Sequence, residues 1–201
     1  MGTAGKILIV IGILVVIVIL VVGWLFGIRN NMVELEEGIN NGWAQVQNQY
    51  QRRFDLIPNL VETVKGFASQ EKEVLVGVTE ARAKAGGVMN IGPEVLNDPQ
   101  AFSRFQEAQA GLGSALQRLL VVVERYPELK SNQNFLTLQA QLEGTENRIA
   151  VERKRFNDQV LKYNSYVRKF PQMFVANIFG FNTKAYFEAV SGAEEVPRVE
   201  F

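Results

Sequence analysis

The chain has 201 residues, of which 21 are basic and 21 acidic, so its formal net charge is zero. A neutral chain lacks the global positive field that recruits nucleic acid, and nucleic-acid binding is not expected. The absence of cysteine and histidine excludes disulfides, thiol nucleophiles, zinc fingers and the Glu-x-x-His di-iron sites of helical bundles.

Residues 7–28 form an uncharged apolar run of twenty-two residues, bracketed by Lys6 and Arg29. As a helix this run would rise ~33 Å at about 1.5 Å per residue, which is enough to cross the ~30 Å hydrocarbon core of a bilayer. A cleaved signal peptide fits poorly, because the run exceeds a typical signal's apolar region and no small-residue cleavage site follows it. We therefore predict a short tail over residues 1–6 and a permanent transmembrane helix over residues 7–28.

The charges that flank the predicted span favour one orientation only slightly. The α-amine and Lys6 lie on one side, against Arg29 alone on the other, which leans towards a soluble domain outside the membrane. Within the span, Gly23 and Gly27 form a G-x-x-x-G pair that would let two such helices approach closely. Glycine is common in membrane helices, so chance spacing is the alternative.

A helical pattern continues directly after the span. Apolar residues recur every three or four positions over residues 32–78, which marks one face of a helix. Since no strong breaker precedes this segment, we predict that the membrane helix runs on through residues 29–85. Gly86 and Gly87 are the expected stop, followed by a loop.

Pro58 interrupts this predicted helix. Proline cannot donate to the carbonyl four residues earlier and its ring is expected to kink the helix there. Asn59 follows directly and is the candidate to serve the freed carbonyl. The alternative is a fresh helix capped by Asp55, with the proline in its first turn.

Two further helices are predicted downstream. Asp98 followed by Pro99 is a specific helix-start signal, and a heptad seam with one polar member covers residues 102–126. Ser131 is the expected cap of a longer helix, whose inward positions extend over residues 135–170. Three long stripes joined by short connections predict antiparallel neighbours that bury their seams together.

The predicted helix over residues 29–85 is longer than the two downstream helices that pack against it. A fourth element is therefore needed to cover the remainder of its apolar face. The aromatic-rich segment over residues 170–189 is the candidate. Its aromatic side chains are too many to leave in water, and we expect them to cap the core, with contact to another protomer or to lipid headgroups as the alternative. The predicted fold is all-α: a single N-terminal transmembrane helix continuing into an antiparallel bundle of three long helices plus this C-terminal segment, over residues 29–190.

Residues 191–201 are predicted to form a small acidic linker and an extended tail, which places Val199 and Phe201 on one face. Such a tail either docks on another chain as an added strand or frays. The candidate interface residues are therefore Phe174, Phe179, Phe181, Val199 and Phe201. The basic cluster Arg153, Lys154 and Arg155 is a candidate contact for anionic lipid, with a solvated ion-pair face as the commoner outcome.

No catalytic, cofactor-binding or metal-binding residue is predicted, and no small-molecule substrate is evident. A nucleophile needs a matched base, and both histidine and cysteine are absent. No G-x-x-x-x-G-K-[ST] loop or other phosphate cradle occurs in the sequence. The sequence therefore predicts a protein that is not an enzyme.

Three stretches carry a resemblance to a known family: residues 41–46 around Trp43, RRFDLIPNLVETVKGF over residues 52–67, and ENRIAVERKRFNDQVLKYN over residues 146–164. The FGF at residues 179–181 agrees as well. Over nearly its whole length the chain resembles the LemA family of bacterial membrane proteins. The resemblance implies a membrane span, a mainly helical bundle, a place in the bacterial cytoplasmic membrane and no established enzymatic activity. Relatives that form magnetosomes, and neighbouring genes for membrane metallopeptidases, imply a role in membrane organisation.

Two functions from different classes follow. The first is a self-associating membrane scaffold, anchored by the span and joined through bundle surfaces or the tail. The second is an accessory subunit that binds another membrane protein, such as a membrane protease, through the aromatic C-terminal segment. Peripheral binding of anionic lipid by the basic cluster is a weaker third. The expected partners are the lipid bilayer, further copies of this chain and another membrane protein.

Overall fold

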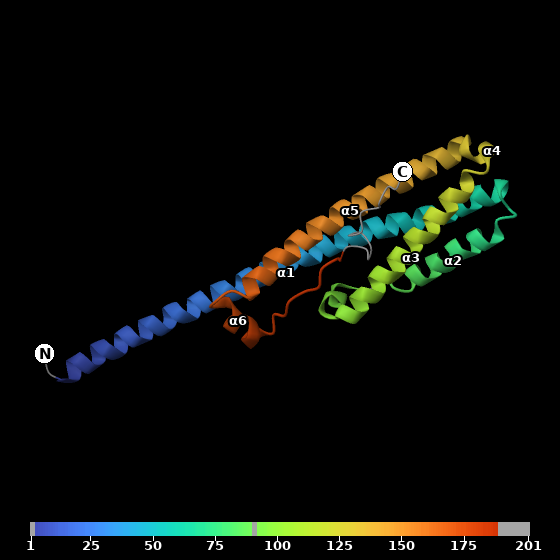
Figure 1. Cartoon of the computed structure of the whole chain (residues 1–201). Helices are drawn as coiled ribbons and strands as arrows, with labels where there is room; N and C mark the ends of the chain where they lie inside the picture. The colour runs from blue at the N-terminus through green and yellow to red at the C-terminus, as the bar shows by residue number, and fades with distance from the viewer. Residues whose placement is uncertain (1–2, 90–91, 189–201) are drawn as a thin grey trace, which may run out of the picture. The chain divides into compact units, whose positions relative to one another are not determined.

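The computed structural model describes residues 3–89 and 92–188, and within these ranges it is helical apart from turns and one extended segment (Figure 1). The elements are α1 (Thr3–Phe67), α2 (Lys72–Gly86), the 3-10 helix η1 (Pro93–Asn97), α3 (Pro99–Val123), α4 (Pro127–Lys130), α5 (Gln133–Val167) and α6 (Gln172–Phe179). No strand occurs in the described ranges, so the predicted all-α class is confirmed. The chain forms two compact units, residues 1–39 with 159–183 and residues 40–158 with 184–201.

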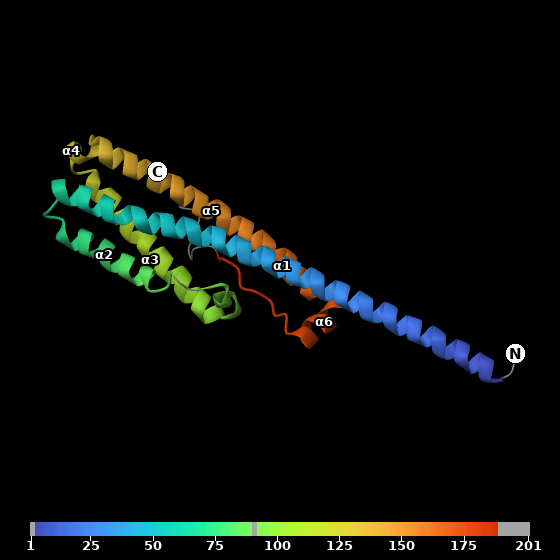
Figure 2. The same ribbon diagram turned by 180° about the vertical axis from the view of Figure 1, so that it is seen from behind.

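The larger unit is a four-helix bundle. It comprises residues 40–67 of α1, α2, α3 and residues 133–158 of α5, and α2 lies beside α3 in both views (Figures 1 and 2). The seams predicted from the apolar spacing form its core, which includes Ile57, Leu60, Val64, Leu112, Leu116, Leu119, Phe135 and Leu142. Burial of these seams is the main stabilising term for such a bundle.

The predicted continuous helix to residue 85 is wrong. α1 ends at Phe67, and the chain reverses through a short turn into α2, which thereby becomes the fourth bundle helix. Glu71 in this turn accepts hydrogen bonds from the Tyr126 hydroxyl at 2.9 Å and pairs with the Arg125 guanidinium at 3.2 Å. The turn contains neither glycine nor proline, and these partners lie more than fifty residues away along the chain, so no local breaker marks it.

Pro58 lies inside α1, which remains one helix through it. The carbonyl that Pro58 frees belongs to Phe54, and it accepts a hydrogen bond from Arg82 Nε of α2 at 3.4 Å. The same guanidinium lies over the Phe54 ring, 3.9 Å from its centroid. The donor to the freed carbonyl is thus Arg82 and not the predicted Asn59, whose side chain is exposed to solvent. A fresh start capped by Asp55 is likewise wrong, because the helix is uninterrupted there.

The two predicted helix starts have different outcomes. Asp98 caps α3 as predicted, since its carboxylate accepts hydrogen bonds from the backbone N–H groups of Gln100 and Ala101 at 2.9 and 3.1 Å. Ser131 does not cap α5: its hydroxyl donates to the Glu128 carbonyl in the short helix α4. The cap is instead the Asn132 side chain, which accepts from the two backbone N–H groups of residues 134 and 135.

The smaller unit contains residues 3–39 of α1, the end of α5 and α6, and both views place α6 beside this part of α1 (Figures 1 and 2). Ile28, Met32 and Ile39 of α1 are buried here. α1 is the one described helix that is long and apolar enough to cross a membrane, and none of its most apolar eighteen-residue window is buried. Length and composition therefore make it the candidate membrane span.

Candidate interaction surfaces

Five large apolar side chains project into solvent from α6 and the turn before it. We call them the α6 surface: Phe170, Met173, Phe174, Ile178 and Phe179, with exposed fractions of 78, 41, 55, 75 and 48%. The predicted capping of the core by the aromatic residues is therefore wrong for Phe170, Phe174 and Phe179. The reason is that α6 has only eight residues and buries its small ones, Val175 and Ala176.

The other predicted interface residues lie elsewhere. Phe181 is half-buried, and Val199 and Phe201 lie outside the described residues, as does the whole predicted tail. The α6 surface lies close to the end of the span. The Arg29 guanidinium, the first charge after the span, lies 5.4 Å from the centroid of the Phe179 ring. A cation at this distance over an aromatic face is attracted by the ring quadrupole.

Gly23 and Gly27 lie on an open face of α1. A Cβ atom added at either glycine would meet no described atom within 4 Å. This openness is compatible with the predicted association of two spans, which stays a prediction.

An extended segment over residues 184–188, here called the strap, completes the aromatic core of the larger unit. The Phe187 ring is buried and lies 4.9 Å from the ring of Phe102, 5.3 Å from that of Phe156 and 6.1 Å from that of Trp43. The Phe105 ring also packs edge-on against Trp43, with the two ring centroids 5.1 Å apart. The strap thus fills a position that the helices leave open.

Side chains of the bundle hold the strap by its backbone. The Asn157 side chain accepts from the Phe187 N–H and donates to the Phe187 carbonyl, both at 2.9 Å. The Glu188 carbonyl accepts from Arg153 at 2.9 Å, and the Glu188 N–H donates to Gln106 at 3.2 Å. These bonds replace the ladder that a neighbouring strand would provide.

The same contacts bear on the predicted lipid-binding cluster. The Arg153 guanidinium bonds to the strap and lies 4.7 Å from the centroid of the Phe187 ring. Two ion pairs engage the other members: Lys154 with Asp158 at 3.0 Å and Arg155 with Glu152 at 2.7 Å. Contact of this cluster with anionic lipid stays a prediction, now on side chains that already have partners.

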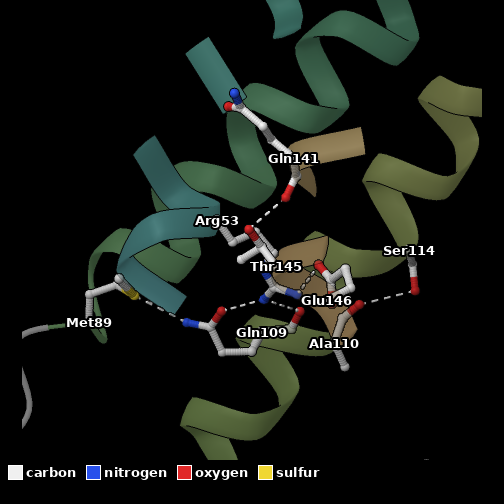
Figure 3. Close-up of polar contacts among 8 residues, drawn as sticks. All are labelled: Arg53, Met89, Gln109, Ala110, Ser114, Gln141, Thr145 and Glu146. Atoms are coloured by element: carbon white, nitrogen blue, oxygen red, sulfur yellow. Dashed lines mark hydrogen bonds and ion pairs between the residues drawn. The ribbon is translucent and has the colours of Figure 1, made fainter. Parts of the chain in front are cut away.

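A buried polar network joins two of the sequence stretches that carry the family resemblance (Figure 3). Arg53 of α1, 3% exposed, donates to the carboxylate of Glu146 on α5 at 2.9 Å. Its other terminal nitrogen donates to the Gln109 side-chain carbonyl at 2.6 Å and to the Gln109 backbone carbonyl at 3.2 Å. The guanidinium also lies over the Tyr50 ring, 5.0 Å from its centroid. These partners all belong to the bundle, so the network fixes α1, α3 and α5 against one another, while the buried Arg53 Nε has no hydrogen-bond partner among the described residues.

A groove runs beside this network, lined by Tyr50, Arg53, Arg153 and Glu146 among others. Burial raises the pKa of the Tyr50 hydroxyl, against the opposing field of the nearby Arg153 and Arg53 guanidinium groups. A raised pKa leaves the hydroxyl neutral and poorly nucleophilic near neutrality. Among the described residues, no three acidic side chains lie close enough to hold a metal ion.

The alkaline stability of the smaller unit is expected to depend on Tyr163. Burial, with a smaller contribution from Glu36, raises the pKa of its hydroxyl above the ordinary 10.0, and the hydroxyl donates to the Asn182 carbonyl at 2.9 Å. The folded state therefore holds this proton more tightly than the unfolded state, so stability is fully present below about pH 10 and is lost as the pH rises further. Denaturant unfolding from about pH 9 to about pH 11 should show a steeper loss for the parent than for Tyr163→Phe.

Tyr186→Phe is the matched control for this experiment, because Tyr186 is 38% exposed. It should reproduce the parent's loss of stability. Equal slopes for the parent and Tyr163→Phe would contradict the assignment.

Three residues that position these surfaces were not singled out from the sequence. Arg82 serves the carbonyl freed by Pro58, Gln109 completes the Arg53 network, and Asn157 holds the strap. Gln109 had a visible signal, because it is the polar member of the heptad seam. Asn157 lies within the stretch over residues 146–164, but its partner backbone is thirty residues later.

A family model described as the LemA family matches residues 42–201. The magnetosome protein MamQ of Magnetospirillum gryphiswaldense is 28% identical over 173 residues, which is 79% of this chain and 64% of that protein. The protein LemA of Metamycoplasma hominis is 22% identical over 174 residues, 87% of this chain and 73% of that protein. The chain thus spans less than two thirds of the length of the MamQ protein.

Proposed function

Because the chain belongs to the LemA family, we propose that it is a non-enzymatic, single-pass membrane scaffold that self-associates and organises the membrane or the proteins in it. The anchor is the apolar part of α1, and the bundle provides the surfaces for assembly. The relative MamQ is by its name a magnetosome protein, and a role in assembling a cellular structure agrees with the proposed scaffold.

The observation that supports this function best is where the apolar surface lies. Large apolar side chains gather on the surface in the span and on the α6 surface, whereas those exposed elsewhere in the described residues, such as Val121, are scattered, and exposed apolar patches mark interaction sites. The polar groups, in contrast, are engaged with one another: Arg53 with Glu146 and Gln109, and Arg153 with the strap. Surfaces for binding, together with polar groups already committed to the fold, favour assembly over chemistry.

Association of the spans is testable at the glycine pair. In detergent, the full-length chain should run as a dimer or larger species by light scattering at micromolar concentration. Gly23→Ile and Gly27→Ile should each weaken association about tenfold, because a branched side chain holds apart helices that small residues let approach. Val18→Phe is the control, since Val18 lies in the same span on the opposite face of the helix from the pair, and this variant should leave the assembly unchanged.

A parent chain that is monomeric under these conditions would contradict self-association. Crosslinking in native membranes separates the remaining candidates. Adducts of the chain with itself support the scaffold, whereas a monomeric chain that crosslinks to a different membrane protein would favour the accessory role instead.

A further inference from the structure

We propose that the α6 surface inserts into the interfacial layer of the bilayer beside the span, with a preference for anionic lipid. This inference rests on the proposed membrane anchoring, but it does not depend on self-association. Three features of the smaller unit carry it: the position of α6, the character of its exposed face, and the charge around it.

The position of α6 is fixed against the end of the span. Phe179 at the end of α6 meets Arg29, and Arg29 follows directly after the last apolar residue of the run. Ile28, the last residue of that run, is only 5% exposed, so the unit covers the span where it leaves the hydrocarbon. A helix held at this level lies at the depth of the lipid headgroups.

The exposed face of α6 continues an aromatic belt. Trp24 and Phe26, in the last turns of the span, are 53% and 54% exposed, and aromatic side chains in this position mark the membrane–water interface. The α6 surface adds further aromatic and apolar side chains at the same level. Because Val175 and Ala176 are the buried residues of α6, its large apolar side chains lie outside the core of the unit.

The segment that contains α6 carries charge of one sign. Residues 165–187 contain no aspartate or glutamate. Arg168 and Lys169, both exposed, immediately precede the α6 surface, and Arg29 lies beside its end. Basic side chains next to an apolar helix face bind anionic headgroups while the face enters the lipid. Glu36 of α1 lies in the same unit and acts on the Tyr163 hydroxyl, but the segment that carries the α6 surface has only basic charges of its own, which matches an anionic lipid surface.

Depth-dependent quenching tests the proposal on the full-length chain. The sequence contains no cysteine, so single variants Phe174→Cys and Ile178→Cys can each carry a bimane label in phosphatidylcholine vesicles. A nitroxide placed on the lipid acyl chain near the headgroup is expected to quench both labels. Phe26→Cys, in the last turn of the span and 54% exposed, is the positive control at the depth of the headgroups. Val121→Cys is the matched negative control, because Val121 on α3 is 70% exposed, close to the 75% of Ile178.

The expected result is quenching at both α6 positions that is several-fold stronger than at Val121. Unquenched α6 labels beside a quenched Phe26 label would overturn the proposal. Labels that are protected from water only as protein concentration rises, without lipid quenching, would assign the surface to a second copy and overturn it as well. Quenched labels on a chain that light scattering finds monomeric would support this inference while refuting the scaffold.

The charge preference has its own measurement. Replacing about 30% of the phosphatidylcholine with phosphatidylglycerol should increase the protection of both α6 labels from an aqueous quencher. The double variant Arg168→Gln and Lys169→Gln should lose this increase. Lys84→Gln with Arg118→Gln, two exposed basic residues of the larger unit, should retain it. Identical protection in both vesicles would overturn the preference for anionic lipid.

Discussion

Replacing Trp43 with alanine is expected to lower the free energy of unfolding by ~3–5 kcal/mol, the largest effect of any single substitution considered for this chain. The indole is 1% exposed and its ring contacts those of Phe102, Phe105, Phe156 and Phe187. Removing it opens a cavity at the point where α1, α3, α5 and the strap meet. Thermal or denaturant unfolding of the full-length chain in detergent would measure the loss.

Two controls separate the cavity from the loss of an aromatic residue. Trp24→Ala removes the other tryptophan, which is 53% exposed in the span, and should leave the unfolding of the bundle unchanged. Trp43→Phe should cost less than about 1.5 kcal/mol, because the buried Nε1 of Trp43 has no acceptor among the described residues and phenylalanine needs none. A Trp43→Ala variant as stable as the parent would contradict the aromatic core described above.

Glu146→Ala is expected to be the second most damaging substitution. It would leave the Arg53 guanidinium, whose side chain is 4% exposed, with Gln109 as its remaining hydrogen-bond partner. Breaking a fully buried ion pair costs ~3–5 kcal/mol. Because the Glu146 side chain is 42% exposed, we expect a loss at the lower end, about 3 kcal/mol. Denaturant unfolding at neutral pH is the measurement.

The double variant Arg53→Met with Glu146→Ala sharpens this prediction. Methionine removes the buried charge while filling part of its volume, so the double variant should be more stable than Glu146→Ala alone. Asp158→Ala, which breaks the exposed Lys154–Asp158 pair on the same helix, is the control and should change stability by about 0.5 kcal/mol or less. Equal losses for Glu146→Ala and Asp158→Ala would contradict a buried network.

The features that the sequence predicts correctly are those with local causes. The apolar run over residues 7–28 is a composition signal, and the Asp98 cap needs only the backbone N–H groups of its own first turn. Heptad spacing likewise identifies the buried seam of α3. Apolar residues at this spacing lie on one face of a helix, whichever element covers that face.

The features that the sequence could not predict are fixed by distant partners. The turn after Phe67 is held by Arg125 and Tyr126, from the turn that follows α3. The carbonyl freed by Pro58 is served by Arg82 of α2, a helix whose position follows from that unpredicted turn. Residue spacing within residues 52–67 therefore predicts neither the turn nor the donor to the freed carbonyl.

The predicted burial of the α6 aromatic residues is wrong for a different reason. Its aromatic count predicts burial on composition alone, but eight residues offer little inward face, and Val175 with Ala176 occupies it. Apolar composition therefore identifies a segment that is excluded from water, but it does not tell whether the protein core or another apolar environment covers that segment. In a membrane protein, lipid is an alternative to the core.

The strap also sets the order in which this protein can be completed during synthesis. The bundle portions of all four helices have been synthesised once residue 158 has been translated. The gap beside Trp43 is filled only later, by Phe187. A nascent chain that stops anywhere between these two points carries every helix of the larger unit and a hole at its centre. Translation of residues 159–187 is thus a checkpoint, which a copy terminated within them fails even though its bundle helices are intact.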